Sequence, residues 1–459
     1  MIYDIAIVGY GPTGATLANL LGLQGFKVAV LERDAAPSPL PRAVHFDGEV
    51  MRIFETAGLA RELLPVIRPS GGMRYVNTAG QVMIERKPAL KIGPHGWANN
   101  YLFHHPHLET ILRHGAERHA GVEVFYDEVV SLSQGQDEVL LKTGTKTLRA
   151  LWAVGCDGAR SIVRQGIGSQ HEDLGLHQPW LVVDVMMERE VELPAQTVQY
   201  CNPARPVTAV KVNALRRRWE IMLMPGDVAE TMTQPENVWR LLEPWIQPGD
   251  ARLERSAVYT FHSLIAKRWR DRRLFIAGDA AHQTPPFLGQ GMCAGIRDAA
   301  NLAWKFSHEH LLSTYQSERE PNVRVYVEEA LRLGAIIQTT DPQVAAERDR
   351  RFLESGKEEM VNLSPPLGPG AHHDGRIFPQ PVLPDGRRLD EAIGGYRWAV
   401  LCPAELSIKT DIQVVPFDGP EAIVLRPDRY IYGTAGSQAE LRKLLGGVSH
   451  ESQTPEPHH

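Results

Sequence analysis

The chain has few cysteines and no segment that marks it for secretion or for a membrane. Its four cysteines among 459 residues are Cys156, Cys201, Cys293 and Cys402, and no two form a Cys-x-x-Cys pair. This argues against a disulfide framework and suits a reducing compartment. No run of about 18 apolar residues occurs, and the chain opens on an apolar strand without a charged leader. We therefore expect a cytoplasmic protein with no membrane segment and no metal site.

The chain also lacks a basic excess. Its formal net charge at pH 7 is -6, whereas nucleic-acid-binding proteins usually carry a surplus of Lys and Arg. Hydrophobic residues make up 43% and charged residues 23%, which is typical of a folded globular protein. A length of 459 residues provides for two or three domains. We expect small molecules, and not nucleic acid, as partners.

The N-terminal residues have the pattern of a β-α-β unit that binds a dinucleotide. Residues 2–8 predict a buried strand, a glycine turn opens a helix, and residues 27–34 predict the next strand. Gly9 permits the tight turn, Gly11 lets a pyrophosphate approach the backbone, and Gly14 allows close packing of helix on strand. A plain β-α-β unit with incidental glycines is the alternative.

Further candidate cofactor residues surround this turn. Pro12 and Thr13 open the helix, whose free N–H groups favour a phosphate. Glu32 ends the second strand, where a carboxylate can accept hydrogen bonds from a ribose, and Arg33 follows it.

A second motif, "GCDGARSIVR", covers residues 155–164 and follows a predicted strand. Its candidate binding residues are Asp157 and Gly158. Asp157 alone also fits a turn in which its side chain caps the next helix, so both interpretations stay open here.

A third motif, "GDAAHQTPPFLGQGM", covers residues 278–292. Asp279 follows a strand end, where it could bond a ribityl or ribose hydroxyl. Pro285 and Pro286 stiffen the loop, because proline removes backbone freedom. Glycines then leave bare N–H groups at a helix start, which would stabilise negative charge on a ring placed against them. The candidate binding residues of this stretch are Asp279, Pro286, Gly289, Gln290, Gly291 and Met292.

The rest of the chain predicts strand-rich and helical segments in turn. Strands fill residues 122–155 and 178–224, a helical pair spans 311–337, and the Pro- and Gly-rich stretch at 364–370 predicts a linker. A small α/β pattern and a polar tail follow.

The three motifs, in this order and spacing, resemble the class A FAD-dependent aromatic hydroxylases, the group of p-hydroxybenzoate hydroxylase. The resemblance covers roughly residues 1–340. Within the group, residues 41–59, "PRAVHFDGEVMRIFETAGL", are similar to 3-(3-hydroxyphenyl)propionate hydroxylases.

The resemblance implies an α/β fold. It has a FAD-binding Rossmann-like domain of the GR2 type, an inserted β-sheet substrate domain and a small C-terminal thioredoxin-like domain. The expected boundaries are 1–175 for the first part of the FAD-binding domain (65–100 joining the substrate region), 176–268 for the substrate domain, 269–363 for the returning helices, 364–372 for the linker, 373–447 for the shortened thioredoxin-like domain and 448–459 for a disordered tail. Cys402 has no second cysteine near it, so no dithiol chemistry is expected there.

The resemblance also assigns roles. It implies that Glu32 holds the adenosine ribose, that Arg42 contacts the phosphate or ribityl region, and that Asp157 serves both FAD and the nicotinamide. Asp279 would hold the ribityl chain. His105 stands where relatives often have glutamine near FAD.

For the reaction, the resemblance implies FAD as the resident cofactor, with NADH or NADPH as hydride donor and O2 as oxidant. Oxygen adds at flavin carbon 4a, and the hydroperoxide attacks an activated phenolic ring. His45 is the first candidate for activating the phenol, Tyr200 the second, and Pro286 lines the flavin ring. A structural histidine and ordinary packing of Tyr200 are the alternatives.

Other functions fit the same fold. A flavin-dependent halogenase or a reductase is the first alternative, although the stretch from Trp219 to Pro225 lacks the halogenase Trp-x-Trp-x-Ile-Pro signature. A non-enzymatic flavin sensor is the second. A homodimer is expected by analogy.

Overall fold

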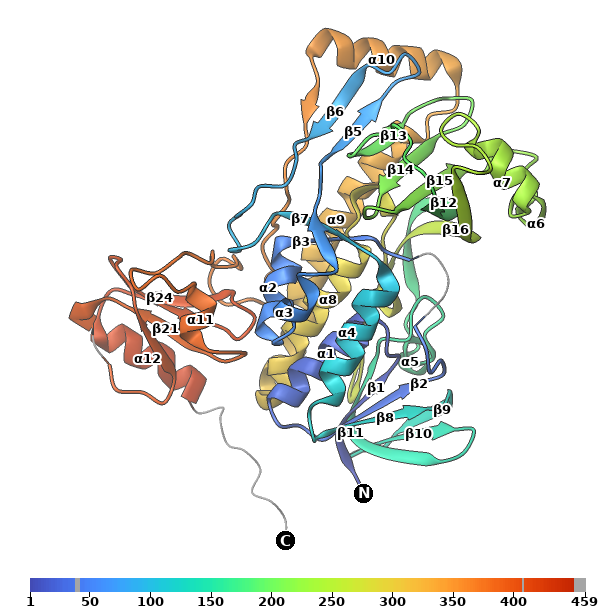
Figure 1. The fold of residues 1–459 in the computed structure, drawn as a ribbon. Coiled ribbons are helices and arrows are strands. Elements are labelled where there is room, and N and C mark those ends of the chain that lie inside the picture. The colour runs from blue at the N-terminus through green and yellow to red at the C-terminus, as the bar shows by residue number, and fades with distance from the viewer. Residues whose placement is uncertain (38–41, 407, 450–459) are drawn as a thin grey trace.

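The computed structural model describes residues 1–37, 42–406 and 408–449. Within them the chain forms four β-sheets. Figure 1 shows a central body, a strand-rich part above it and a smaller unit at its side.

The first sheet carries the glycine turn at the end of its central strand. Five strands run in the order β18, β11, β1, β2, β8, each parallel to its neighbour, and their apolar side chains are mostly buried. Helices α1 (Pro12–Leu23) and α8 (Gly291–Ala303) share one hydrophobic core with these strands. The strands are β1 (Tyr3–Val8), β2 (Val28–Glu32), β8 (Val122–Tyr126), β11 (Thr147–Gly155) and β18 (Leu274–Ile276).

Antiparallel strands extend this sheet. Strands β9 (Val129–Gln134) and β10 (Val139–Thr143) form a hairpin on the first half of β11, and β17 (Arg270–Asp271) pairs with β18. Helix α5 (Ile162–Ile167) follows β11.

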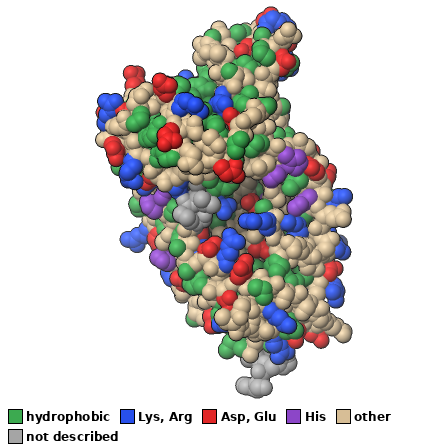
Figure 2. All heavy atoms as spheres, turned by 90° about the vertical axis from the view of Figure 1, so that its right-hand side faces the viewer, with side chains coloured by type: hydrophobic (Ala, Val, Ile, Leu, Met, Phe, Trp, Pro, Cys, Tyr) green, Lys and Arg blue, Asp and Glu red, His purple; other side chains and the backbone are tan. Residues whose placement is uncertain are grey.

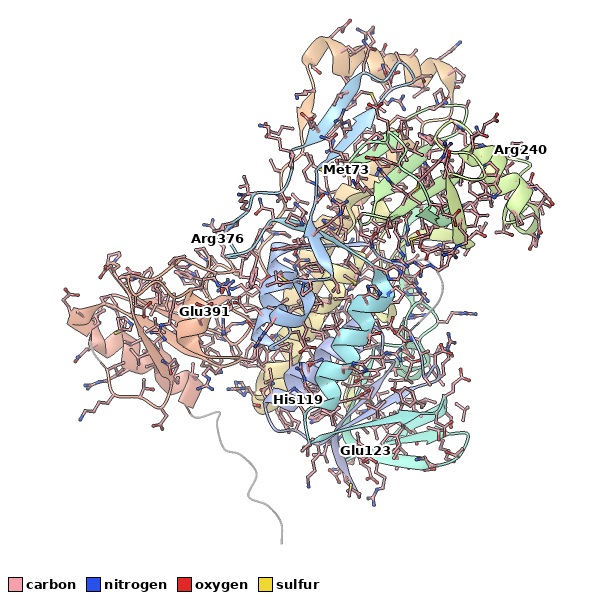
Figure 3. The ribbon with its side chains drawn as sticks, viewed as in Figure 1. Met73, His119, Glu123, Arg240, Arg376 and Glu391 are labelled. Atoms are coloured by element: carbon pink, nitrogen blue, oxygen red, sulfur yellow. The ribbon has the colours of Figure 1, made fainter. Side chains whose placement is uncertain are left out.

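A nine-stranded sheet forms the upper part, where Figure 3 labels Met73. Its order is β19-β16-β12-β15-β14-β13-β5-β6-β20. Side chains alternate between two faces. Trp180 and Met222 pack toward Phe287 and helix α9 (Tyr315–Ile337), whereas Trp219 and Ile221 pack toward helix α7 (Pro235–Leu242). The strands are β5 (Met73–Val76), β6 (Val82–Arg86), β12 (His171–Met187), β13 (Thr197–Tyr200), β14 (Val207–Lys211), β15 (Arg216–Met222), β16 (Ala251–Ala266), β19 (His282–Gln283) and β20 (Glu358–Glu359).

A three-stranded sheet joins these two parts. It consists of β3 (His45–Asp47), β7 (Asn100–Phe103) and β4 (Ile67–Pro69), in that order. Helices near it are α2 (Gly48–Thr56), α3 (Ala60–Leu63) and α4 (His105–Glu117).

The remaining helices flank the upper sheet. Helices α6 (Ala229–Met232) and α7 (Pro235–Leu242) lie at its outer face. The predicted helical pair at 311–337 is instead a 3-10 segment (Glu309–Thr314) followed by one helix, α9 (Tyr315–Ile337), with Pro321 inside it. The turn opened by Pro321 is filled by the linker, where the Gly368 N–H donates to the Glu318 carbonyl at 2.8 Å. Helix α10 (Pro342–Ser355) follows.

The C-terminal unit has a sheet of order β22-β21-β23-β24. Strand β22 is parallel to β21 and β23 is antiparallel to it, which is the thioredoxin-like arrangement, and the fold class predicted from the sequence is confirmed. Helix α12 continues to Ser449, two residues into the predicted tail, and residues 450–459 lie outside the described chain. The other domain boundaries stay predictions. The elements are α11 (Leu389–Ile393), β21 (Ala399–Cys402), β22 (Gln413–Pro416), β23 (Ala422–Leu425), β24 (Ile431–Ala435) and α12 (Gln438–Ser449).

Buried ion pairs join the C-terminal unit to the central body, on the side where Figure 3 labels Glu391 of α11. Arg52 of α2 donates to the Asp390 carboxylate of α11 at 2.6 and 2.8 Å, and Arg429 donates to the same carboxylate at 2.9 Å. Arg426 donates to Glu318 of α9 at 2.9 Å. Because a buried charge is costly without its partner, these pairs require the two parts to stay docked.

Over the described residues, none of the helices combines the length and apolar character needed to cross a membrane.

The Asp390 pairing gives an expected pH dependence. Burial alone would raise the pKa of this carboxyl, but Arg52 and Arg429 hold it at about 2, below its usual 3.8. The depressed pKa contributes about 2 kcal/mol to stability above about pH 4, and this is lost as the pH falls toward 2. In Asp390→Asn this titration is absent, so urea-unfolding free energies should fall less steeply between about pH 5 and pH 3. The control is Asp137→Asn, whose carboxylate is 90% exposed and which should keep the wild-type slope; a wild-type slope in Asp390→Asn would contradict the assignment.

Candidate functional site

The turn after β1 has the close contacts that its glycines predict. Gly9 has φ +98°, and a Cβ atom there would lie 2.4 Å from the Cys156 carbonyl oxygen. A Cβ atom on Gly14 would lie 2.0 Å from the Gly9 carbonyl oxygen. Gly11 differs, because no atom of the described residues lies within 4 Å of its Cβ position. Gly9 and Gly14 therefore serve packing, whereas Gly11 leaves open space above the turn.

Two helix starts around this space have no side-chain cap. Helix α1, which begins at Pro12, and helix α8, which begins at Gly291, have none, whereas Asp47, Ser161 and Asp341 cap α2, α5 and α10. The first N–H groups of α1 and α8 are therefore available to an anionic group.

The Glu32 carboxylate lies beside the turn and already holds its shape. It accepts hydrogen bonds from the N–H groups of Tyr10 at 2.6 Å and Asp34 at 3.0 Å. Arg113, which sequence reasoning missed, donates to the carbonyls of the same two residues at 3.1 Å and to Glu109 at 2.6 Å. Each Glu32 oxygen keeps a lone pair for a further donor.

Arg33 and His105, both predicted to bind the cofactor, lie in different environments. Arg33 forms an exposed ion pair with Asp34 at 3.0 Å. His105 is buried at the start of α4, with Nε2 3.1 Å from Glu109 and with no partner for Nδ1 in the described residues. Burial lowers the pKa of His105, so its ring is neutral near pH 7.

Asp157 makes the helix contacts that the sequence left open as one interpretation. Its Oδ2 accepts from the N–H groups of Ile162 at 2.7 Å and Val163 at 3.4 Å, and Gly158 turns the chain with φ +76°. The other oxygen, Oδ1, is buried and finds no donor in the described part of the chain. One half of the carboxylate is thus structural and the other half is free.

Asp279 sits in a short 3-10 turn (Gly278–Ala280) fixed from behind. The Gly278 N–H donates to Asp298 of α8 at 3.0 Å. A Cβ atom on Gly278 would lie 2.7 Å from the Thr13 hydroxyl, and one on Gly295 of α8 would lie 2.3 Å from it. Thr13 thus packs where α1, α8 and this turn meet.

The Asp279 side chain combines solvent exposure with a raised pKa. It is exposed to solvent, yet the surrounding protein desolvates it enough to raise its pKa, which Arg42 and His282 oppose. The charge of the exposed Arg42 also acts on His105. Figure 2 shows this face of the molecule hollowed between its upper and lower parts, with Lys and Arg side chains nearby. Arg42 is therefore near enough to both His105 and Asp279 for its charge to act on them.

The proline–glycine loop (residues 285–291) is held by side chains from the strands beside it. His45 Nδ1 lies 3.2 Å from the Gly289 carbonyl oxygen, and Nε2 lies 2.8 Å from Asn100 Oδ1. The Tyr75 hydroxyl donates to the Phe287 carbonyl at 3.3 Å. Burial and the charge of Arg86 lower the pKa of His45. Both His45 nitrogens face acceptor oxygens of the chain, and a neutral imidazole can donate its single N–H to one of them, so in this arrangement the residue positions the loop.

Gln290 lies at the end of the loop, and a hydrogen bond from Arg297 holds its side chain. Arg297 of α8 donates from Nη1 to Gln290 Oε1 at 3.0 Å. Met292, one residue into α8, is partly buried against the core.

An aromatic cluster, defined as Trp180, Phe261 and Phe287, connects the loop to the nine-stranded sheet. Trp180 stacks on Phe261 with ring centroids 5.9 Å apart and meets Phe287 edge-on at 5.6 Å. The sequence predicted strands here but gave no signal for which faces would meet the loop. Pro286 precedes Phe287 and so stands directly beside this cluster.

Arg86 is a buried cation that sequence reasoning also missed. It is 6% exposed, and no hydrogen bond or ion pair holds its guanidinium within the described residues, where its Nε is an orphaned donor. Its charge acts on His45, Tyr75 and Asp47, all close to the loop. A buried guanidinium without an acceptor is costly, so this position favours an anion beside it.

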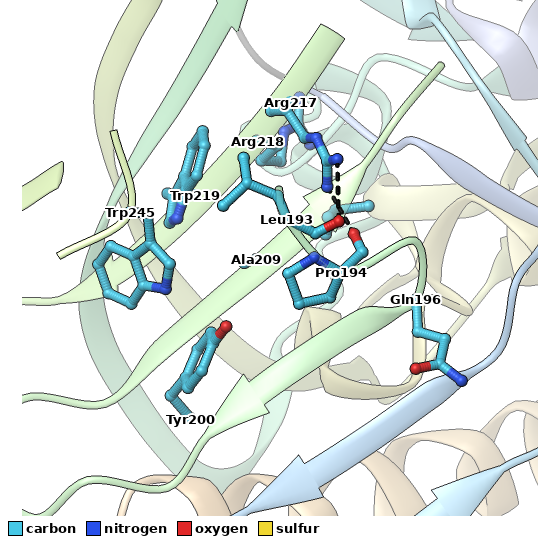
Figure 4. Close-up of a pocket in the computed structure, with 10 residues that line it drawn as sticks. Leu193, Pro194, Gln196, Tyr200, Ala209, Arg217, Arg218, Trp219 and Trp245 are labelled. Atoms are coloured by element: carbon cyan, nitrogen blue, oxygen red, sulfur yellow. Dashed lines mark hydrogen bonds between the residues drawn. The ribbon is translucent and has the colours of Figure 1, made fainter. Parts of the chain in front are cut away.

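Tyr200 does not join these residues. It packs with Trp219 on the outer face of the sheet, and its ring lies 5.3 Å from that of Trp245. Figure 4 shows these three aromatic side chains around a pocket into which Arg217 also reaches, donating to the Pro194 carbonyl at 2.5 Å. The aromatic cluster lies on the opposite face, so the structure brings His45 and Pro286 together without Tyr200.

Comparisons with known proteins agree with this geometry. The family described as "FAD binding domain" matches residues 2–330. The probable NADH-specific resorcinol 4-hydroxylase of Rhodococcus jostii (strain RHA1) is 36% identical, covering 96% of this chain and 93% of its own. The 3-(3-hydroxy-phenyl)propionate/3-hydroxycinnamic acid hydroxylase of Burkholderia cenocepacia (strain HI2424) is 34% identical, over 86% and 78%.

The chain belongs to the FAD-dependent aromatic hydroxylases. Among solved structures, aklavinone-11 hydroxylase in a ternary complex with FAD and aklavinone has a TM-score of 0.80 at 22% identity, covering 96% of this chain and 98% of its own. At that identity the likeness concerns the fold alone. As a member of this hydroxylase family the protein is a flavoprotein monooxygenase, and the family predicted from its motifs is confirmed.

The site fits the cofactor of this hydroxylase family. The space at Gly11, the uncapped start of α1, the unpartnered Asp157 Oδ1 and the exposed carboxylate of Asp279 offer an anion site and hydrogen-bond acceptors for hydroxyl groups. These features come from segments more than 100 residues apart, which converge only in the fold.

Gly11→Ala and Gly14→Ala form a matched pair that separates binding from packing. Alanine at Gly11 meets no atom, and its φ of -70° suits any residue, so the apoprotein should keep or slightly raise its unfolding temperature. FAD should bind at least about tenfold more weakly, because the methyl group occupies phosphate space. Alanine at Gly14 should lower the unfolding temperature of the apoprotein, since the backbone of Gly9 blocks it. Thermal unfolding and FAD fluorescence titration measure both, and wild-type FAD affinity in Gly11→Ala would refute the assignment.

Proposed function

We propose that the protein hydroxylates a phenolic aromatic compound, with FAD as resident cofactor, NADH or NADPH as reductant and O2 as oxygen source. The observation that carries the proposal is the contact between the proline–glycine loop and the aromatic cluster. An aromatic substrate bound beside this contact would lie next to the flavin site. A bound FAD supplies the two-electron chemistry that activates O2.

We assign the cofactor contacts as follows. The turn at Gly9, Gly11 and Gly14, with Pro12 and Thr13 at the start of α1, would hold the pyrophosphate, and Glu32 the adenosine ribose. Asp279 and Arg42 would hold the ribityl chain and its phosphate. Asp157 Oδ1 and His105 Nδ1 lack a partner in the described residues, and we assign both to the cofactor. The segment that would line the flavin ring consists of Pro286, Gly289, Gln290, Gly291 and Met292.

The substrate is best assigned as a phenol with a second substituent on the ring. The relatives at 36% and 34% identity are named for resorcinol and for 3-(3-hydroxy-phenyl)propionate, and both names describe a phenol substituted at the meta position. We propose ortho-hydroxylation of a phenol of this class, such as a 3-hydroxyphenylpropionate-like acid. The relative named as NADH-specific supports NADH as the first reductant to test.

Arg86 would take the phenolate form of this substrate. A phenolate is more nucleophilic than a phenol, and a buried cation favours the ionised hydroxyl. His45 would act on the loop through Gly289 and so position the ring of the cofactor. Direct catalytic roles for His45 and Tyr200 stay predictions, as does a homodimer.

The test is flavin reduction followed by stopped-flow absorbance, with NADH and NADPH, with and without resorcinol or 3-(3-hydroxyphenyl)propionate. One phenol should speed reduction by at least about tenfold, equal to about 1.4 kcal/mol of activation free energy. The product should gain one oxygen atom by mass spectrometry. Phenylpropionate, which lacks the hydroxyl group, is the control. Equally fast reduction without any aromatic compound, and no hydroxylated product, would favour a reductase.

Arg86→Met tests the anion site. Losing a charged hydrogen bond of about 1.5 to 3 kcal/mol should lower kcat/KM by about tenfold to a hundredfold. The pH profile should also move to higher pH, because the phenol then ionises without help. Lys87→Met is the matched control, since Lys87 is the next residue and its side chain is 68% exposed. Equal kinetics in the two variants would remove Arg86 from the proposal.

A further inference from the structure

One side chain of the C-terminal unit reaches the proline–glycine loop through two intermediates. The Tyr430 hydroxyl donates to Glu49 Oε1 of α2 at 3.0 Å. Arg297 Nε donates to Glu49 Oε2 at 2.7 Å, and its Nη1 donates to Gln290 Oε1 at 3.0 Å. Its third nitrogen, Nη2, pairs with Asp47. These five residues form a continuous hydrogen-bonded chain, the Tyr430 relay.

The relay fixes which way the Gln290 amide faces. A guanidinium has donors only, so the amide must turn its oxygen toward Arg297. The Nε2 group then points away from Arg297, and it has no acceptor within the part of the chain that the structure describes. Gln290 therefore presents an N–H donor, next to Gly289 and Gly291 of the loop.

The charges of the relay explain why Tyr430 matters. Arg297 carries one positive charge between the carboxylates of Asp47 and Glu49, so one negative charge is in excess. The Tyr430 hydroxyl satisfies the Glu49 oxygen that Arg297 does not. Without it, the second Glu49 oxygen is free to turn toward Nη2, which lies beside Nε, and compete there with Asp47. The guanidinium would then shift, and with it the Nη1 group that holds Gln290.

A strained backbone conformation at the preceding residue fixes the position of Tyr430. Arg429, just before it, has φ +69°, a conformation that residues other than glycine rarely adopt. Its side chain is 2% exposed and donates to Asp390 at 2.9 Å and to the Arg397 carbonyl at 3.1 Å. These bonds hold a strained turn whose result is the placement of Tyr430 at the interface.

We propose that the C-terminal unit tunes the flavin through this relay: Tyr430 and Arg297 are positioning residues that aim the Gln290 amide at the cofactor as a hydrogen-bond donor. A donor aimed at the ring favours the reduced, more negative flavin. The proposal rests on the FAD site and holds whichever aromatic compound is the substrate. Its readouts therefore need no substrate and can fail independently of the proposed reaction.

The experiment compares Tyr430→Phe with Tyr396→Phe in the full-length FAD-bound protein. Both variants lose one hydroxyl of the C-terminal unit at the same interface, but Tyr396 donates to the Ala300 carbonyl, ten residues along α8 from Gln290. Tyr430→Phe should make the midpoint potential of bound FAD more negative and weaken FAD binding about threefold, the size of one net hydrogen bond. Tyr396→Phe should leave both values unchanged while losing similar thermal stability.

A double-mutant cycle isolates the path. In a Gln290→Leu background, Tyr430→Phe should have no further effect on the potential or on FAD affinity, because the relay already ends short of the flavin. An unchanged effect in that background, or equal effects of the two tyrosine variants, would overturn the proposal. Glu49→Gln, which weakens the middle of the relay, should reproduce the shift of Tyr430→Phe and serves if that variant does not fold.

Discussion

The buried carboxylate of Asp298 on α8 is the contact on which the arrangement of the site depends. It accepts from the Gly278 N–H at 3.0 Å, from Arg319 of α9 at 2.8 Å, and lies 2.6 Å from His282 Nε2. Burial alone would raise the pKa of Asp298, but His282 and Arg319 hold it below its usual range. The Asp298 carboxylate thus joins the turn that carries Asp279, the strand after it and the long helix α9. Removing a partner side chain would leave a charge without compensation in the core.

The neighbouring residue, Arg297, holds the proline–glycine loop from another side of α8, as Asp298 holds the turn at Asp279. Successive helix residues point in directions about 100° apart, so one helix can hold the Asp279 turn with one side chain and the loop with the next. Because Arg297 also binds Glu49 and through it Tyr430, the C-terminal unit is bonded into the site and is not a separate appendage. The ion pairs of Arg52 with Asp390 and of Arg426 with Glu318 hold the C-terminal unit in a fixed position on the central body.

The sequence predicted best what depends on short-range geometry. The turn at Gly9 and Gly14 and the uncapped start of α1 follow from the spacing of a few residues, and the structure has both. Arg86, Arg113, Arg297 and Asp298 escaped prediction because an arginine or aspartate carries no local signal of burial. Most partners of the last three lie far along the chain, and Arg86 has none among the described residues. The predicted helical pair failed at Pro321 for a similar reason: the distant linker supplies the packing and a hydrogen bond that let one helix continue through the proline.

The proline–glycine loop shows why these distant contacts are needed. The Gly289 N–H donates to the Pro286 carbonyl at 2.9 Å, whereas Gly291 begins α8 without a side-chain cap. The glycines give the chain no stiffness, and Pro285 and Pro286 fix only the loop's first half. Contacts from neighbouring strands and from α8 fix the rest of the loop. Tyr75 of β5 holds the Phe287 carbonyl, His45 of β3 meets the Gly289 carbonyl, and Arg297 of α8 holds the Gln290 side chain. A site whose donors must stay fixed during the reaction gains more from such supports than from side chains that touch the substrate, which is why a His45 held against the Gly289 carbonyl suits this loop better than a free base would.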